Sequence, residues 1–234
     1  MSLLTNLTSY YKFDESSGNP ADSVGSNTLT NNGTVTYVAA KINNGANLAI
    51  ASSQFLSRAS QSFNSTAGTI SAWVKLTSQP SVAGYSFCIF STSPNTGAEG
   101  VDFLMSSDAT PVIRVYFGNA AGGVASHTTA LTNGVWYHMV ATWTTARKDI
   151  YLDGTLVGSN TNAQTQTAGS TTAYVGNQSA APTRYADMVV DEMGIWSRAI
   201  TAAEVTELYN GGSGISHPFT ISSSQPALMM GAAF

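Results

Sequence analysis

Hydrophobic and polar residues alternate along short segments of the chain, and turn residues separate these segments. The clearest segment is TISAWVKL, residues 69–76. Every second side chain from Ile70 to Leu76 is apolar and would face a core, whereas Trp73 would face the opposite side. A period of two is typical of a strand with one buried face. Other strand-like segments, rich in aromatic and β-branched residues, are 85–90, 101–105, 112–117 and 136–143.

Glycine-containing turns join the strand-like segments. Asp153 and Gly154 connect KDIYL to TLVG and predict a two-residue type I′ turn, because both central positions of that turn need positive φ. Further turns are expected at Asn32-Gly33, Asn44-Gly45 and Asn133-Gly134. Helices do not alternate with the strands, which argues against a parallel α/β sheet. The pattern therefore predicts an all-β protein, an antiparallel two-sheet sandwich.

One short helix near the C-terminus is predicted from its start and stop signals. Thr201 and Glu204 form a capping box, in which each side chain accepts a hydrogen bond from the backbone N–H of the other. An apolar stripe follows at Val205 and Leu208, and Gly211 marks the end. The predicted helix has about three turns at most.

The chain changes character after residue 212. Residues 211–214, GGSG, have the composition of a flexible linker, and the last residues are apolar and nearly uncharged. Because an apolar chain end is unfavourable in water, we expect this tail to dock on its own domain or on a neighbouring subunit. The expected division is a sandwich domain, 1–212, and a linker with an apolar tail, 213–234. The predicted tail contacts are Pro226, Leu228, Met229, Met230 and Phe234.

The composition is low in charge. Charged residues make up only 9% of the 234 residues, whereas about 25% is typical of globular chains. The net charge is -4 and no stretch is rich in Lys or Arg, so we expect no nucleic-acid partner. No segment approaches the roughly 20 apolar residues of a membrane span, and a secretory signal pattern is missing, so no membrane insertion is expected. The one cysteine, Cys88, lies in an apolar run and is expected to be a buried thiol.

Four motifs, taken in order, are similar to those of one superfamily. The opening motif is LTSYYKFDESSGN at residues 7–19 with DSVG after it, and the closing motif DEMGIWSRAIT spans 191–201. Between them lie GTISAWV at 68–74 and WYHMVATW at 136–143, the second followed by IYLDG. Together they resemble the laminin-G-like, concanavalin-A-like jelly-roll superfamily over about residues 5–212. The resemblance implies a jelly-roll sandwich with one short C-terminal helix. It implies no single function, because this fold serves lectins, enzyme accessory modules, adhesion domains and virion proteins.

The opening and closing motifs also carry a large share of the acidic residues, and they should be neighbours if the sandwich closes edge to edge. Calcium takes about six to eight oxygen ligands from carboxylates, amides and carbonyls. The resemblance adds that members of the superfamily often carry a structural calcium. The predicted ligands are Asp14, Asn19, Asp22 and Asp191, and no other cofactor is expected. The alternative is that these side chains cap turns or pair with Arg198 or Arg184.

A catalytic carboxylate pattern is missing from the expected strands. Retaining glycosidases on related jelly rolls look like Glu-x-Asp-x-x-Glu on one strand, which presents the carboxylates on a single face. In the nearest segment, DMVVDE, Asp191 and Glu192 are adjacent and would point to opposite faces, and Asp187 would lie roughly 13 Å from Asp191. The histidines are scattered, and His138 on an alternating strand is expected to be structural. We therefore expect no catalytic residues and no enzyme activity.

Carbohydrate binding would need exposed aromatic rings that stack on sugar faces, with polar groups that hold the hydroxyls. The candidate rings are Tyr37, Phe55, Tyr85, Tyr116 and Tyr185. For each ring, packing in the core or on a strand face is the alternative.

The sequence favours a non-enzymatic structural or binding protein. Low charge, the apolar tail and a domain that begins close to Met1 suggest a bacteriophage virion component, made in the host cytoplasm. Such a capsid decoration, tail or fibre-associated subunit would assemble through its sandwich and tail, as a homo-oligomer or with other virion subunits. The first alternative is a lectin-like module for cell-surface glycans, placed outside the cell by a non-classical route. The second is a glucanase-type glycoside hydrolase, which the missing carboxylate pattern disfavours.

Overall fold

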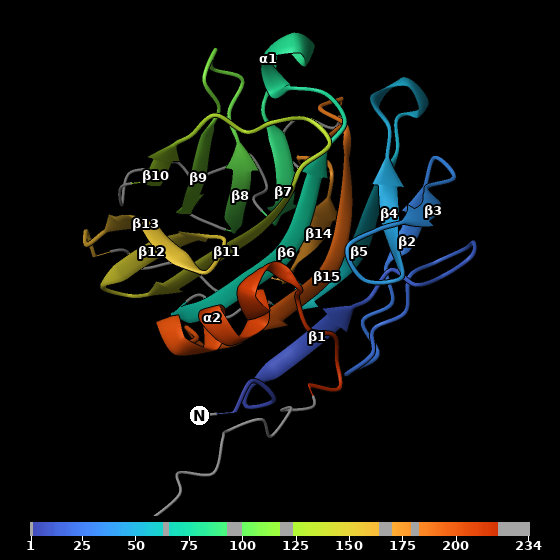
Figure 1. The fold of residues 1–234 in the computed structure, drawn as a ribbon. Helices are drawn as coiled ribbons and strands as arrows, with labels where there is room; N and C mark the ends of the chain where they lie inside the picture. The colour runs from blue at the N-terminus through green and yellow to red at the C-terminus, as the bar shows by residue number, and fades with distance from the viewer. Residues whose placement is uncertain are drawn as a thin grey trace, which may run out of the picture.

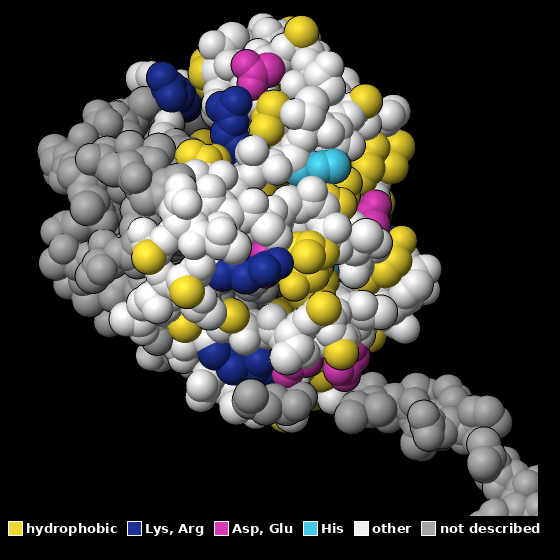
Figure 2. Space-filling model, turned by 90° about the vertical axis from the view of Figure 1, so that its left-hand side faces the viewer, with side chains coloured by type: hydrophobic (Ala, Val, Ile, Leu, Met, Phe, Trp, Pro, Cys, Tyr) yellow, Lys and Arg dark blue, Asp and Glu magenta, His cyan; other side chains and the backbone are white. Residues whose placement is uncertain are grey.

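The fold is a sandwich of two antiparallel β-sheets with a short C-terminal helix packed on one of them, as predicted (Figure 1). The computed structural model describes residues 2–62, 66–92, 100–117, 124–163, 170–178 and 183–219. Within these residues, no helix is long and apolar enough to cross a membrane. The face shown in Figure 2 carries few Lys, Arg, Asp and Glu side chains, in keeping with the low overall charge.

The first sheet has eight strands in the order β13-β12-β11-β6-β15-β4-β3, with β1 also paired to β15. Its strands are β1 (Leu7–Tyr11), β3 (Thr36–Ala39), β4 (Asn44–Leu48), β6 (Ala67–Leu76), β11 (Trp136–Thr144), β12 (Arg147–Leu152), β13 (Thr155–Asn160) and β15 (Met188–Trp196). Leu7 lies opposite Trp196 in the pairing of β1 with β15. The opening and closing motifs of the sequence are therefore neighbours, as expected.

The second sheet has seven strands in the order β10-β9-β8-β7-β14-β5-β2. Its strands are β2 (Thr30–Asn32), β5 (Phe55–Ser62), β7 (Phe87–Ser91), β8 (Val101–Met105), β9 (Val112–Phe117), β10 (Ala125–Thr128) and β14 (Ser170–Val175). The helical elements are η1 (Ile50–Ser52), α1 (Pro80–Ala83), α2 (Ala202–Tyr209) and η2 (Asn210–Gly212). Strands β2 and β3 end the two sheets on the same side of the sandwich (Figure 1).

The main core fills the space between the sheets, and alternation along β6 shows how the sequence builds it. Ile70, Val74 and the other even-numbered apolar residues of β6 are fully buried in this core. Trp73 points to the outer face, where its ring stacks on Tyr209 with 5.8 Å between centroids. Both sides of the strand match the predicted pattern.

The predicted hairpin turn and helix cap are also confirmed. Asp153 and Gly154 have φ of 49° and 79°, the two positive values that a type I′ turn needs. At the start of α2, the Thr201 side chain accepts from the Glu204 N–H, and the Glu204 side chain accepts from the Thr201 N–H. These local signals therefore mark the ends of their elements in the sequence.

A second apolar cluster lies on the outer face of the eight-stranded sheet beneath α2. Val205 and Leu208 of the helix pack on Tyr151 and Trp196 of the sheet. The chain then turns at Gly214, whose N–H donates to the Tyr209 carbonyl over 3.1 Å. The first residues of the predicted tail extend this cluster through Ile215 and Phe219. The predicted tail contacts, Pro226, Leu228, Met229, Met230 and Phe234, lie outside the described residues, so the tail's role in assembly stays a prediction.

Candidate functional site

A cleft of about 620 Å³ opens on the side of the sandwich where β2 and β3 lie. Its walls are the loop 16–19, the segment 34–37 and the side chain of Asn31, and we call it the Tyr37 cleft after its one aromatic residue. The volume falls in the range of sites that hold small ligands. The sequence singled out Tyr37 and Asn19 of this cleft, but not the cleft itself.

Asn31 ties the two walls of the Tyr37 cleft together. Its side-chain oxygen accepts from the Val35 N–H over 2.7 Å, and its amide nitrogen donates to the carbonyls of Val35 and Gly18, each over 2.9 Å. The Asn31 N–H donates to Oδ1 of Asn19 over 2.8 Å, and the Tyr37 hydroxyl donates to the Gly18 carbonyl over 2.8 Å. These bonds fix the cleft before any ligand enters it.

The chemistry of the cleft is neutral. Tyr37 is half-buried, and burial, together with the nearby charge of Glu15, raises its pKa to about 12. The phenol is therefore protonated at physiological pH. The remaining side chains of the lining are Ser, Thr, Asn and Val, and none of the lining residues is charged. Such a site offers hydroxyl and amide hydrogen bonds beside one aromatic ring.

Two buried carboxyl groups lie close to this side of the molecule, in β15. Asp191 is 0% exposed and Glu192 is 3% exposed. Oδ2 of Asp191 accepts from the Ile42 N–H over 2.8 Å, whereas Oδ1 of Asp191 has no hydrogen-bond partner among the described residues. Burial raises the pKa of Asp191 to about 8 and that of Glu192 to about 7. Strict strand alternation fails here, because the register shifts between Asp191 and Gly194 and Glu192 has a φ of 48°.

The structure places the four predicted calcium ligands in different roles. Asp14 accepts from Asn43 and Asn44, and its charge contributes to the raised pKa of Asp191. Asp22 caps the following turn, with Oδ1 accepting from the N–H groups of Tyr10 and Val24 and Oδ2 from that of Asn27. Asn19 accepts from Asn31 in the cleft wall.

Side-chain oxygens that already accept backbone hydrogen bonds are poorly placed to coordinate an ion. Among the described residues, no group of three or more His, Cys, Asp or Glu side chains could hold a metal. Asp14 and Asp191 are brought near each other, but Asp22 caps a turn, which was the alternative interpretation, and Asn19 holds the cleft wall through Asn31. The four residues do not fit one calcium site as they stand, and bound calcium stays a prediction. Neither predicted arginine pairing occurs, because Arg198 binds Glu204 and Arg184 donates to Gln178.

The other candidate rings differ in their surroundings. Phe55 and Tyr185 lie 6.0 Å apart between centroids at an interplanar angle of 32°, both half-buried. Tyr85 packs partly against the main core, as the alternative interpretation expected, and the side chain of Tyr116 lies outside the described part of the structure. Of the described candidate rings, Tyr37 is the one that lines the cleft.

Potential nucleophiles and bases are buried in structural positions. His138 is 1% exposed, its Nε2 lies 2.9 Å from the Ser71 hydroxyl, and burial lowers its pKa to about 3. Cys88 is fully buried, and burial raises its pKa well above the ordinary value. A neutral histidine and a protonated thiol in such positions are structural groups.

The sequence profile of the Concanavalin A-like lectin/glucanases superfamily matches residues 50–206 of the chain. The chain belongs to this superfamily. A comparison with curated protein sequences found no match. Membership agrees with the motifs of the sequence, and it leaves the ligand open, because one fold carries many functions.

Solved structures show the same concanavalin A-like fold. Domain 4 of AbnA, an extracellular arabinanase of Geobacillus stearothermophilus seen with arabinotriose, has a TM-score of 0.66 at 20% identity and covers 86% of this chain and 97% of its own. The binding domain of Paraclostridial Mosquitocidal Protein 1 has a TM-score of 0.68 at 17% identity, and the match covers 90% of this chain and 53% of that one. The receptor binding domain of a botulinum neurotoxin C/D mosaic serotype has a TM-score of 0.68 at 12% identity, and the match covers 88% of this chain and 51% of that one. This chain thus spans about half the length of the two toxin domains.

These comparisons bear on the two main predictions unequally. The three structures named above are an enzyme-associated domain with a bound sugar and two binding domains. None of the three is described as a virion protein, so a virion role for this concanavalin A-like domain gains no support and stays a prediction. The lectin-like alternative has the better support.

Proposed function

We propose that the protein is a non-enzymatic recognition module that binds a carbohydrate in the Tyr37 cleft. The observation that carries the proposal is a cleft of about 620 Å³ whose lining combines one aromatic ring with neutral hydroxyl and amide groups. Two structural neighbours with the same fold support it, one seen with arabinotriose and one described as a receptor binding domain.

The lining suits the two faces of a sugar. A pyranose or furanose ring has an apolar C–H face, which packs on an aromatic side chain such as Tyr37, and an edge of hydroxyls, which exchange hydrogen bonds with neutral polar groups. Ser16, Ser17 and Thr34 present such groups in the cleft. Because Asn31 already holds the walls in place, little conformational entropy would be lost on binding.

A binding role is favoured over glycoside hydrolysis by the same lining. Glycosidases flank the scissile bond with two carboxylates roughly 5–9 Å apart. The residues that line the cleft include no Asp, Glu, His or Cys. Asp14 and Glu15 come directly before the wall residues 16–19 but are not among the residues that line the cleft, and Asp191 and Glu192 are buried in β15. We therefore propose recognition without chemistry.

Blocking the cleft should weaken binding strongly. Ser17 is exposed and lines the cleft, so Ser17→Trp places a bulky ring where a sugar would sit. Thr145→Trp, in the exposed turn between β11 and β12, is the matched control. We expect affinity for the best ligand on an oligosaccharide array to fall at least about tenfold in Ser17→Trp, about 1.4 kcal/mol, and to stay near wild type in the control.

Titration calorimetry with the best array ligand, and melting curves for each variant, complete the test. Equal binding by both tryptophan variants would place the carbohydrate elsewhere on the protein. Failure of the wild-type protein to bind any array member would rule out the proposed function.

A further inference from the structure

Glu15 lies at the base of the loop that forms one wall of the Tyr37 cleft. Its Oε1 accepts from the Ala21 N–H over 2.8 Å, which closes the loop on itself. The residues directly after Glu15 are the wall residues 16–19. The second oxygen, Oε2, is buried and has no hydrogen-bond partner among the described residues. The carboxylate is therefore anchored at one oxygen and uncompensated at the other.

Positive charges that could neutralise this region are engaged elsewhere. Lys41 places its Nζ 4.4 Å from the centroid of the Trp73 ring, and Arg58 donates from its guanidinium to the Ser26 carbonyl over 2.9 Å. The charge of Lys12 opposes the rise that burial causes in the pKa of Glu192, and it adds to the lowering that burial causes in the pKa of His217. Asp14 adds a second carboxylate next to Glu15 in the chain. No Lys or Arg is among the residues that line the cleft.

We infer that the Tyr37 cleft selects neutral saccharides and rejects those that carry carboxylate, sulfate or phosphate groups, with Glu15 as the residue that sets this specificity. The inference rests on the proposed function, because it names the class of ligand for the same site.

The physical reason is charge repulsion without a counter-ion. Anionic groups are recognised in proteins by Arg or Lys, with Arg giving two parallel hydrogen bonds. The cleft offers neither, and a partly buried carboxylate is screened less by salt than an exposed one. Glu15 is joined directly to the wall residues 16–19, and its charge contributes, after burial, to the raised pKa of Tyr37 in the cleft.

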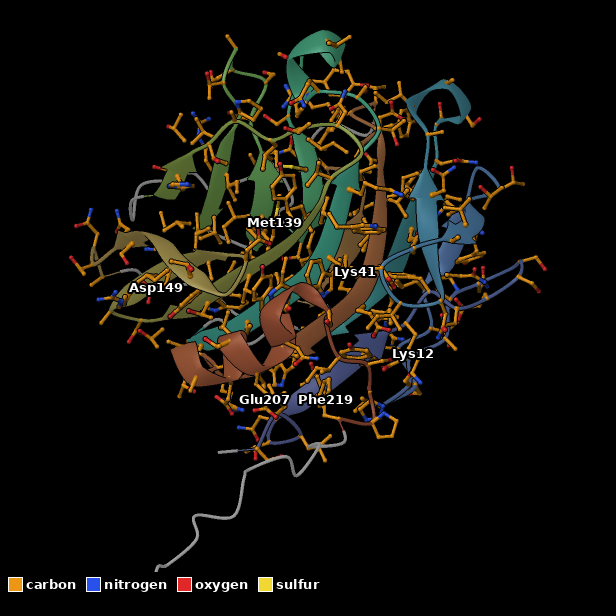
Figure 3. The ribbon with its side chains drawn as sticks, in the orientation of Figure 1. Lys12, Lys41, Met139, Asp149, Glu207 and Phe219 are labelled. Carbon is orange, nitrogen blue, oxygen red and sulfur yellow. The ribbon has the colours of Figure 1, made fainter. Side chains whose placement is uncertain are left out.

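Pairs of glycans that differ only in charge test the inference. The probes are lactose against 3′-sialyllactose, and neutral oligosaccharides on an array against their sulfated or uronic-acid counterparts. Glu15→Gln keeps an acceptor for the Ala21 N–H and removes the charge. Ser17→Lys adds a positive charge at an exposed position of the cleft wall. It therefore tests the effect of charge on ligand choice even if the Glu15 variant folds poorly. Glu207→Gln is the matched charge control, because Glu207 is exposed on α2, away from β3 (Figure 3).

Wild type and Glu207→Gln should prefer the neutral member of each pair at least about tenfold, and Glu15→Gln should reduce that preference to about threefold or less. Ser17→Lys should favour the acidic member. Equal or tighter wild-type binding of acidic glycans, abolished by Ser17→Trp, would overturn the inference and leave the proposed function standing. The absence of binding to either member of any pair would overturn both.

Discussion

The free energy of unfolding is expected to be higher at pH 5 than at pH 8, because Asp191 and Glu192 are buried as neutral acids. Burial raises their pKa values to about 8 and about 7 in the folded protein. In the unfolded chain both groups titrate near pH 4. Between these values the folded state binds more protons than the unfolded state. Stability therefore falls as the pH rises, by up to about 1.4 kcal/mol per pH unit for each group.

Two other groups act in the opposite direction at lower pH. Burial holds the pKa of His138 at about 3, so stability is lost as the pH falls below about 6.5, where the unfolded histidine takes up a proton. Burial alone would raise the pKa of Glu204, but hydrogen bonds from Arg198 and Thr201 outweigh it and hold the pKa at about 2. Its contribution is lost below about pH 4. The net loss from pH 5 to pH 8 is on the order of 3–5 kcal/mol.

Denaturant unfolding at a series of pH values measures this dependence. The Asp191→Asn/Glu192→Gln double variant should lose the fall in stability between pH 6.5 and pH 8. At pH 8 it should be more stable than the wild type. Glu207→Gln, at an exposed position on α2, should follow the wild-type curve. A double variant whose curve parallels the wild type above pH 6.5 would show that the two acids do not remain neutral in the folded protein.

Removal of Arg198 should cost about 3–5 kcal/mol of stability, because it leaves a buried carboxylate without its partner. Arg198 donates to both oxygens of Glu204, over 2.8 Å and 2.6 Å, and both residues are nearly inaccessible. The guanidinium also donates to the carbonyls of Ser2 and Thr5. It therefore joins the start of the chain to the start of α2.

Arg198→Met keeps most of the side-chain volume and removes these bonds, and Arg147→Met is the control. Arg147 forms a pair with Asp149 over 2.7 Å, but its side chain is 47% exposed. Exposed pairs of this kind contribute about 0–1 kcal/mol. Chemical denaturation of both variants should show a large loss for Arg198→Met and a small one for Arg147→Met. Equal losses would mean that the buried pair contributes no more than a surface pair.

Local sequence patterns predicted the elements whose cause is itself local. The alternation of apolar residues predicted which face of β6 is buried, and Asp153-Gly154 predicted the turn between β12 and β13. The Thr201 capping box predicted the start of α2. The short helix α1 was missed, although Pro80 at its first turn and Gly84 after its end are ordinary helix boundary signals. A four-residue helix has no apolar period to detect.

The candidate site depended on contacts that no local pattern reveals. The Tyr37 cleft is assembled from small polar residues of types that occur throughout the chain, and only the fold brings the loop 16–19 against 34–37. Asn19 and Asp22 carry the kind of oxygen atoms that bind calcium, but in the fold these oxygens accept hydrogen bonds from backbone N–H groups. The prediction that Asp191 and Glu192 point to opposite faces likewise assumed a regular strand, whereas the pairing register shifts between Asp191 and Gly194.

The most direct measurement of carbohydrate binding in the Tyr37 cleft is a chemical-shift titration of ¹⁵N-labelled protein with the neutral oligosaccharide that binds best on the array. We expect the largest shifts to fall on residues 16–19, Asn31 and residues 34–37, and we expect Ser17→Trp to remove them. Shifts centred on another surface, such as the one around Phe55 and Tyr185, or no shifts at saturating sugar, would contradict it.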